Sequence, residues 1–153
     1  MPSSWRIVKE TWKHAAFTGE GSRRWLGRWN SRGIPVVYTA ESRSLAILEA
    51  LVNFEGADRR RLPPCVLFEA RFDERWIETV EPRTLPRDWD AYPATPASRA
   101  VGDRWAAELS AAVLRVPSIV TRGEFDYLLN PAHPDFARIE IGPPEPVLWD
   151  PRL

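Results

Sequence analysis

Residues 17–54 constrain the fold of this chain more than any other stretch. A glycine-rich segment leads into a short apolar strand, expected at 34–39, and then into a helix expected at 42–54. Ser42 suits the N-cap of that helix and Gly56 suits its end. The helix is apolar nearly all round, which is typical of a buried helix. We therefore expect most of the remaining chain to serve as a scaffold for this strand and helix.

The expected helix has one polar stripe in its interior. Ser42, Glu49 and Asn53 share that stripe when successive residues turn by about 100°. A carboxylate there faces either solvent or a polar cleft, because burying it unpaired is costly. Beside a sugar C1, such a carboxylate can stabilise an oxocarbenium-like transition state, as in glycoside cleavage. Glu49 is thus either a catalytic carboxylate or part of a solvated helix face.

Residues 19–33 carry too many glycines for regular structure, so we expect a long loop there. A long loop inside a compact domain is functional or disordered, and Trp25 and Trp29 argue against disorder. Arg28 suits bidentate contact with phosphate oxygens, and Gly27 would let the backbone approach a ligand closely. The alternative for Arg28 is stacking between the two tryptophans or pairing with an acid.

Two hydroxyl groups are further candidates. Tyr38 ends the expected strand, where its ring can pack against the base or sugar of a ligand. The alternative is a core tyrosine with a satisfied hydroxyl. Ser118 follows Pro117 after an apolar strand, and no Gly-x-Ser-x-Gly turn surrounds it. A ligand-binding hydroxyl is therefore favoured over a nucleophile.

The remaining pattern is one of short strands and irregular, proline-rich segments. Strands are expected at 5–8, 65–72, 76–80, 125–129, 136–141 and 146–149, an extended segment at 114–120 and another helix at 96–112. Strands and helices do not alternate regularly, which argues against a doubly wound sheet. We expect one α+β domain over residues 1–153, with about six to eight short, mixed or antiparallel strands and a few helices.

Composition excludes several classes of protein. The formal net charge is +0, so nothing demands a nucleic acid or a membrane as partner. The single cysteine, Cys65, excludes an internal disulfide, and two isolated histidines argue against a dedicated zinc site. Cys65 sits in an apolar run and is expected to be buried. No apolar run approaches the length of a membrane span and no signal-peptide core follows the first residues, so a cytoplasmic protein is expected.

Several motifs occur in order and together resemble one family. They are Phe17-x-Gly19-x-Gly21, Gly27-Arg28-Trp29-Asn30, Val36-Val37-Tyr38-Thr39-Ala40-Glu41, Leu45-Ala46-x-x-Glu49, Val116-Pro117-Ser118 and Leu129-Asn130-Pro131-x-His133-Pro134. This set resembles the RES-domain family, named for a characteristic Arg, Glu and Ser. The resemblance covers about 5–149 and is most specific at 27–49. Leu26, where a glycine is common, and Ser31-Arg32-Gly33, in place of Ser-Pro-Gly, are the departures.

The resemblance implies a fold similar to that of ADP-ribosyltransferase toxins. It also implies a toxin of a bacterial toxin–antitoxin pair whose partner is an Xre-like antitoxin. Such a protein breaks the nicotinamide–ribose bond of NAD+ by hydrolysis or phosphorolysis. NAD+ would then be a substrate and not a recycled cofactor, and no metal is implied. The acceptor, and any homo-oligomer within the toxin–antitoxin complex, remain open.

The resemblance also assigns roles to four residues. Arg28 would grip a phosphate of NAD+, and Tyr38 would pack against the nicotinamide end. Glu49 would stabilise the positive charge that forms as nicotinamide leaves. Ser118 would position the substrate or a neighbouring side chain. The further substrate contacts expected are Arg6, Gly27, Trp29 and Asn30.

Two other functions stay open from the residues alone. The same site could transfer ADP-ribose to a protein or a nucleic acid. Alternatively, Arg28 and the tryptophans could contact RNA in a non-enzymatic binding module. The zero net charge and the lack of a basic stripe weigh against the RNA-binding function.

Overall fold

The computed structural model describes residues 1–54 and 58–153 and contains one mixed, 8-stranded sheet. The strand order is β4-β5-β6-β2-β1-β3-β7, and β8 also pairs with β3. Its strands are β1 (Ser3–Lys9), β2 (Val37–Ala40), β3 (Cys65–Arg71), β4 (Ile77–Thr79), β5 (Val113–Pro117), β6 (Phe125–Leu129), β7 (Glu140–Ile141) and β8 (Glu145–Pro146). The α-helices of the described residues are α1 (Glu20–Arg24), α2 (Arg43–Asn53) and α3 (Pro96–Glu108). Only the β4–β5 pair is parallel within the described sheet, so the expected α+β class with short mixed strands is confirmed.

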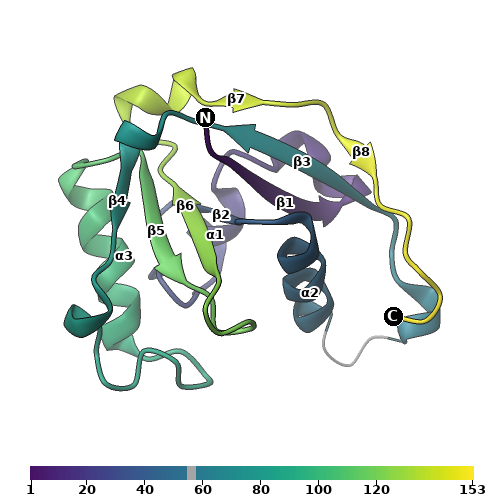
Figure 1. Ribbon diagram of the computed structural model, residues 1–153, viewed down its shortest axis with the longest axis horizontal. Coiled ribbons are helices and arrows are strands. Elements are labelled where there is room, and N and C mark those ends of the chain that lie inside the picture. Colours follow the sequence, from purple (N-terminus) through teal and green to yellow (C-terminus); the bar gives the residue numbers. More distant parts are fainter. Residues whose placement is uncertain (55–57) are drawn as a thin grey trace.

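Two helices cover one face of the sheet at different places (Figure 1). On α2, Leu45 and Ala46 pack against Ala40 of β2 and Leu67 of β3. On α3, Trp105 packs in a separate cluster with residues of β5 and β6, namely Leu114, Val116 and Leu128. The sheet face between these two helical contacts includes the end of β2 and the start of β6.

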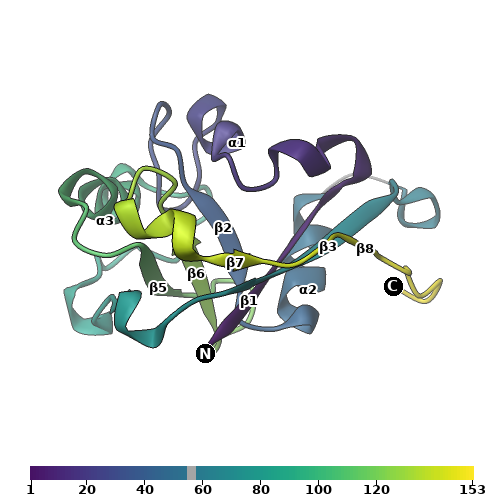
Figure 2. The ribbon, with the colours of Figure 1, turned by 90° about the horizontal axis from the view of Figure 1, so that it is seen from above.

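The opposite face is covered by the chain that follows β1. Ala16 packs against Val66 and Phe68 of β3, and the partly buried Phe17 joins them. Figure 2 shows β1 and β3 running side by side, in a register that extends from Ser3↔Arg71 to Lys9↔Cys65. This long ladder fixes β1 firmly to β3.

The pairing of β1 with its other neighbour, β2, is much shorter. Its register contains the single pair Trp5↔Ala40, so the two strands separate beyond that point. The Arg6 side chain bridges them: its Nη1 donates to the Tyr38 carbonyl at 2.9 Å and its Nε donates to the Ala16 carbonyl at 2.6 Å. A side chain thus satisfies a backbone carbonyl at the place where the ladder ends.

Helix α2 begins as expected. The Ser42 side chain accepts a hydrogen bond from the Leu45 amide at 3.0 Å, which confirms the N-cap. The suggested end at Gly56 lies outside the described residues. The expectation that the helix is buried all round was wrong: Leu48 and Val52 are 43% and 51% exposed. The helix lies on the sheet with one side, so its other side remains in contact with solvent.

Other boundaries also differ from expectation. The segment 19–33 is not entirely loop, because it contains α1. The second helix ends at Glu108 and not at 112, since Leu109 takes a left-handed conformation with φ 52. Much of the strand expected at 136–141 is a 3-10 helix, Pro134–Arg138, capped by His133. The last two strands shrink to β7 and β8, while Cys65 is buried as expected.

No helix among the described residues combines the length and the hydropathy that crossing a membrane requires.

Candidate active site

A pocket of about 80 Å³ lies beside the separation of β1 and β2. Its walls include Trp5 and Arg6 from β1, Tyr38 from β2, and Glu49 and Asn53 from α2. Glu49 and Asn53 of the polar stripe therefore face a polar pocket. Of the two surroundings expected for Glu49, solvent or a polar cleft, the structure shows the cleft. Pockets for whole drug-sized ligands measure roughly 300–1,000 Å³. In this conformation the pocket has room for one end of such a ligand.

Ser118 holds the carboxylate of Glu49. The buried Ser118 hydroxyl donates to Glu49 Oε1 at 3.0 Å. Ser118 Oγ in turn accepts hydrogen bonds from the amides of Val120 and Thr121 at 3.1 and 3.3 Å, which fixes the serine in the turn after β5. This arrangement fits a serine that positions a neighbouring side chain. It brings together two residues that the sequence predicted for the site.

Asp126 is a third member of this group, and sequence reasoning missed it. It lies in β6, opposite Ala40 of β2 and Val116 of β5. Its side chain forms a hydrogen bond with Glu49, and no amide or hydroxyl of the described residues donates to its buried Oδ1. An acid in the middle of a strand was the available signal, because a buried carboxyl needs a partner. We call Glu49, Ser118 and Asp126 the carboxyl cluster.

The two acids of the carboxyl cluster influence each other's ionisation. Burial, followed by the charge of Glu49, raises the pKa of Asp126 to about 10. Burial also raises the pKa of Glu49, while hydrogen bonds from Asp126 and Ser118 act in the opposite direction. Two neighbouring carboxyls in such a site cannot both ionise easily. Burial and the charge of Glu49 therefore both favour the protonated form of Asp126.

Arg6 places a positive charge in the pocket wall. Burial lowers the pKa of its guanidinium to about 10, so the group is still charged at neutral pH. Its hydrogen bonds go to the carbonyls of Ala16 and Tyr38, and no acid of the described residues forms an ion pair with it. A charged arginine that lacks an acidic partner is suited to an anionic ligand.

The segment 27–30, which we call the aromatic loop, is held by its own hydrogen bonds. The Tyr38 hydroxyl donates to Asn30 Oδ1 at 2.5 Å and accepts from the Trp29 amide at 3.1 Å. Burial raises the pKa of Tyr38 above its usual range. A Cβ on Gly27 would overlap both Asn30 Oδ1 and the Tyr38 hydroxyl, so only glycine fits there. The hydroxyl of Tyr38 is satisfied by the fold, as the core alternative expected, while Tyr38 still lines the pocket.

The expected substrate contacts of Trp29 and Asn30 need correction. Their side chains are 2% and 0% exposed. The Asn30 amide donates to three backbone carbonyls, those of Ser22, Trp25 and Ser31. Trp29 packs in the core with α3. Both side chains support the loop from inside and do not present a surface to a ligand.

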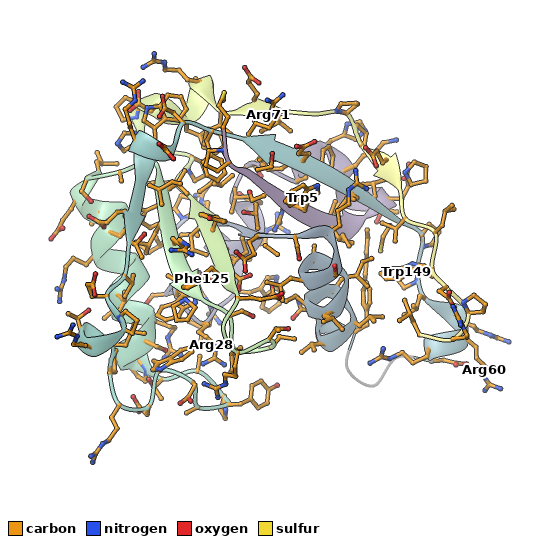
Figure 3. The ribbon with its side chains drawn as sticks, viewed as in Figure 1. Trp5, Arg28, Arg60, Arg71, Phe125 and Trp149 are labelled. Atoms are coloured by element: carbon orange, nitrogen blue, oxygen red, sulfur yellow. The ribbon has the colours of Figure 1, made fainter. Side chains whose placement is uncertain are left out.

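The Arg28 side chain is held by backbone carbonyls of a segment far along the chain. Its Nη1 donates to the carbonyls of Trp89 and Ala91, at 2.8 Å each. Neither alternative from the sequence describes it, because Trp25 is 69% exposed and the main contacts are carbonyls. Desolvation lowers the pKa of Arg28, and nearby Asp90 opposes that effect. In Figure 3, Arg28 appears below Phe125, at the end of the molecule away from Arg71.

The structure therefore brings the predicted residues together in two groups. Glu49 and Ser118 form one group with the unexpected Asp126. Tyr38 links the aromatic loop to the pocket wall, and Arg6 lines the same pocket. Arg28 has no hydrogen bond to the carboxyl cluster among the described contacts. The arrangement places a guanidinium and a carboxyl side chain in the wall of one small pocket.

Comparison with known proteins assigns the family. Residues 3–150 match the model of the RES domain, and the chain belongs to the RES-domain family. It is 37% identical over 158 residues to the Prs ADP-ribosylating toxin of Sphingobium sp. (strain YBL2), covering 99% of this chain and 96% of that protein. It is 33% identical to the protein named Toxin Res of Yersinia enterocolitica serotype O:8 / biotype 1B, with 97% of each chain covered.

A solved structure shares the fold. The crystal structure of the M. tuberculosis MbcT–MbcA toxin–antitoxin complex contains a chain that superposes with a TM-score of 0.72. The match covers 95% of this chain and 84% of that chain, at 16% sequence identity. At that identity the likeness defines the architecture and leaves the chemistry to be argued from the site.

Proposed function

We propose that this chain is the toxin of a toxin–antitoxin pair and that it cleaves the nicotinamide–ribose bond of NAD+. Membership of the RES-domain family and two relatives named as toxins support the first part. The observation that carries the second part is the Glu49 carboxylate, held by Ser118 in a small pocket that Arg6 also lines. A fixed negative charge in a small, partly closed pocket suits a reaction that creates positive charge.

The chemistry needs little more than that charge. When the bond between ribose C1 and the nicotinamide nitrogen breaks, its electron pair leaves with nicotinamide, which becomes neutral. Positive charge then develops on the ribose, and the Glu49 carboxylate stabilises it. Water or phosphate forms the new bond to C1, and a water nucleophile loses its proton to solvent. Because nicotinamide is already a cationic leaving group, no strong general acid is required.

The shape of the pocket favours entry of the nicotinamide end. A volume of about 80 Å³ has room for a ring and not for a dinucleotide, so the phosphates would remain near its mouth. The ring of Tyr38 would form one wall against the nicotinamide. Arg6 carries a positive charge in the wall of this pocket, and it would bind a ribose-linked phosphate. Arg28 would reach a more distant phosphate after exchanging its carbonyl contacts with Trp89 and Ala91.

The test is nicotinamide release by the purified protein. We expect Glu49→Gln to lower the turnover rate about 100- to 1,000-fold, because the developing charge loses its counter-charge. Arg28→Ala should raise the NAD+ concentration needed for half-maximal rate. The matched controls are Glu108→Gln and Arg104→Ala, which change exposed residues of α3. Phosphate, present in one series and absent in the other, identifies the acceptor. A folded wild-type protein that leaves NAD+ intact in both series contradicts the proposal.

A second activity is favoured by one specific observation. The relative that is 37% identical is named as a Prs ADP-ribosylating toxin. In that case a nucleophile of a protein acceptor, in place of water or phosphate, forms the bond to ribose C1. Labelled NAD+ would then transfer its label to a purified acceptor such as Prs. Label that appears only in free ADP-ribose or its phosphate supports the first activity.

The proposed partner is an Xre-like antitoxin. A toxin that consumes NAD+ must be restrained, and the simplest physical route is a segment of the partner that covers the pocket beside Glu49. Addition of the co-expressed antitoxin should lower turnover in proportion to the complex formed. An antitoxin that binds tightly yet leaves NAD+ access and turnover unchanged contradicts this arrangement.

A further inference from the structure

The carboxyl cluster contains one acid more than the cleavage reaction uses. Asp126 lies in β6, interacts with Glu49, and is not among the residues that line the pocket. Its buried Oδ1 receives no donor from an amide or hydroxyl of the described residues. An acid without such donors is expensive to keep in a sheet interior, so it needs a physical explanation.

Two carboxyl groups can form a hydrogen bond only when one of them holds a proton. The contact between Asp126 and Glu49 is such a bond. Glu49 also accepts from the Ser118 hydroxyl at 3.0 Å. With the proton on Asp126, the charged Glu49 accepts from two donors, Asp126 and Ser118, whereas with the proton on Glu49 the charged Asp126 would accept from Glu49 alone and its buried Oδ1 would have no donor among the described amides and hydroxyls. The geometry therefore places the proton on Asp126.

We propose that Asp126 is a positioning residue that stays protonated and donates a hydrogen bond to Glu49, so that Glu49 presents the single negative charge of the pair to the pocket. This inference rests on the proposed cleavage of NAD+. Without this donor, the pKa of the buried Glu49 would be higher and its carboxylate would take up a proton more readily. A protonated Glu49 would have no charge with which to stabilise the ribosyl cation.

The surroundings of Asp126 support a neutral side chain. The charged groups that act on it are Glu49 of α2, Glu41 of the turn before α2, and Glu124 of the turn before β6. All three are acids. Tyr38, from β2, is the other titratable neighbour, and its pKa is also raised. Arg115 of β5 lies over the ring of Phe125, and it pairs in register with Tyr127 and not with Asp126. No neighbouring cation among these groups favours ionised Asp126.

The first test measures the proton directly in the free protein. Carbon NMR of the side-chain carboxyls, followed through a pH titration, reports which acids are ionised. We expect Asp126 to remain protonated at about pH 7, in contrast to a control acid such as the exposed Asp150. Glu49 should be ionised at the same pH. An Asp126 that is already ionised at that pH overturns the proposal, whatever the protein does with NAD+.

Two substitutions test the hydrogen bond. Asp126→Asn keeps a donor of the same shape, so Glu49 should titrate within about half a pH unit of wild type. Asp126→Leu removes the donor, and Glu49 should titrate about one pH unit higher or more. In the pH profile of NAD+ turnover, the acid limb should move to higher pH in Asp126→Leu. In Asp126→Asn it should stay at the pH where the wild type has it. If Asp126→Leu does not fold, the titration of Glu49 in Asp126→Asn is compared with that in wild type. A shift of more than about half a pH unit then contradicts the proposal.

The outcomes separate the two proposals. A wild type that fails to cleave NAD+ while Asp126 holds its proton removes the proposed function and leaves the carboxyl pair intact. Wild-type cleavage with an acid limb that is the same in Asp126→Leu and wild type removes the role of Asp126 alone. Equal loss of turnover in the folded asparagine and leucine variants also overturns it, because asparagine preserves the donor.

Discussion

The carboxyl cluster and the aromatic loop both contain predicted site residues, yet they differ in how their polar groups are satisfied. In the aromatic loop, the Tyr38 hydroxyl and the Asn30 amide bond to groups of the fold itself. In the carboxyl cluster, Glu49 and Asp126 depend on one shared proton. The hydrogen-bond network of Tyr38, Trp29 and Asn30 is therefore neutral, and its energy is independent of pH near neutrality. The cluster holds a charge that both protons and ligands can change.

The largest expected difference between these regions is in the pH dependence of stability. The pKa of Asp126 is raised in the folded protein to about 10, above its ordinary value near 4 in the unfolded chain. Between these values the folded state binds one proton more than the unfolded state, so stability falls as the pH rises. The greatest slope is about 1.4 kcal/mol per pH unit, or about 3 kcal/mol between pH 6 and pH 8.

Urea unfolding at several pH values measures this slope. In Asp126→Asn the same region of pH should show a flatter curve, because the amide does not titrate. Substitutions in the aromatic loop should shift the whole curve without changing its slope. An equal slope in wild type and Asp126→Asn would show that the carboxyl cluster is not the source of the pH dependence.

The next effect concerns how α3 supports the aromatic loop. A Cβ on Gly102 would overlap the backbone carbonyl of Trp29, which cannot turn aside as a flexible side chain would. The adjacent Asp103 accepts from the Ser31 amide at 2.7 Å, so a shifted helix would also strain this contact. We expect Gly102→Ala to lower the free energy of unfolding by about 2–3 kcal/mol, as overpacking in a core does.

Gly21→Ala is the matched control for that substitution. Gly21 lies in α1, and a Cβ there would meet no atom within 4 Å. Alanine favours a helix over glycine, so this variant should be as stable as wild type or slightly more stable. Thermal or urea unfolding of the two variants gives the comparison. A Gly102→Ala protein as stable as Gly21→Ala would mean that α3 moves away from Trp29 at no cost.

The same two regions show what the sequence could predict. The face of Glu49 and the cap at Ser42 follow from helical periodicity and local hydrogen bonding, and both are visible in α2. Asp126 meets Glu49 through the register of β6 on β2, which depends on pairing between distant strands. The carbonyl partners of Arg28 come from an irregular, proline-rich segment with no periodic signal. Helical periodicity therefore predicts the polar stripe of α2. The residues that contact this stripe depend on the pairing and packing of distant segments, which the local sequence does not predict.

A smaller effect is expected when the hydroxyl group of Tyr38, which stabilises the fold, is compared with that of Ser118, which donates to Glu49. Tyr38→Phe keeps the ring in the pocket wall but leaves the buried Trp29 amide and Asn30 Oδ1 without a partner. We expect this change to reduce the free energy of unfolding by about 1–2 kcal/mol. The acid limb of NAD+ turnover should stay where the wild type has it, because Tyr38 has no hydrogen bond to the carboxyl cluster among the described contacts.

Ser118→Ala gives the opposite pattern. It removes the donor to Glu49 Oε1, so the pKa of Glu49 should rise and the acid limb should move to higher pH. It also removes the acceptor for the Val120 and Thr121 amides, so some loss of stability accompanies the kinetic change. Rate profiles and urea unfolding of the two variants, recorded together, separate these effects. If Tyr38→Phe moved the acid limb as far as Ser118→Ala, the aromatic loop and the carboxyl cluster would be one electrostatic unit, and the distinction between a neutral scaffold and a titrating site would fail.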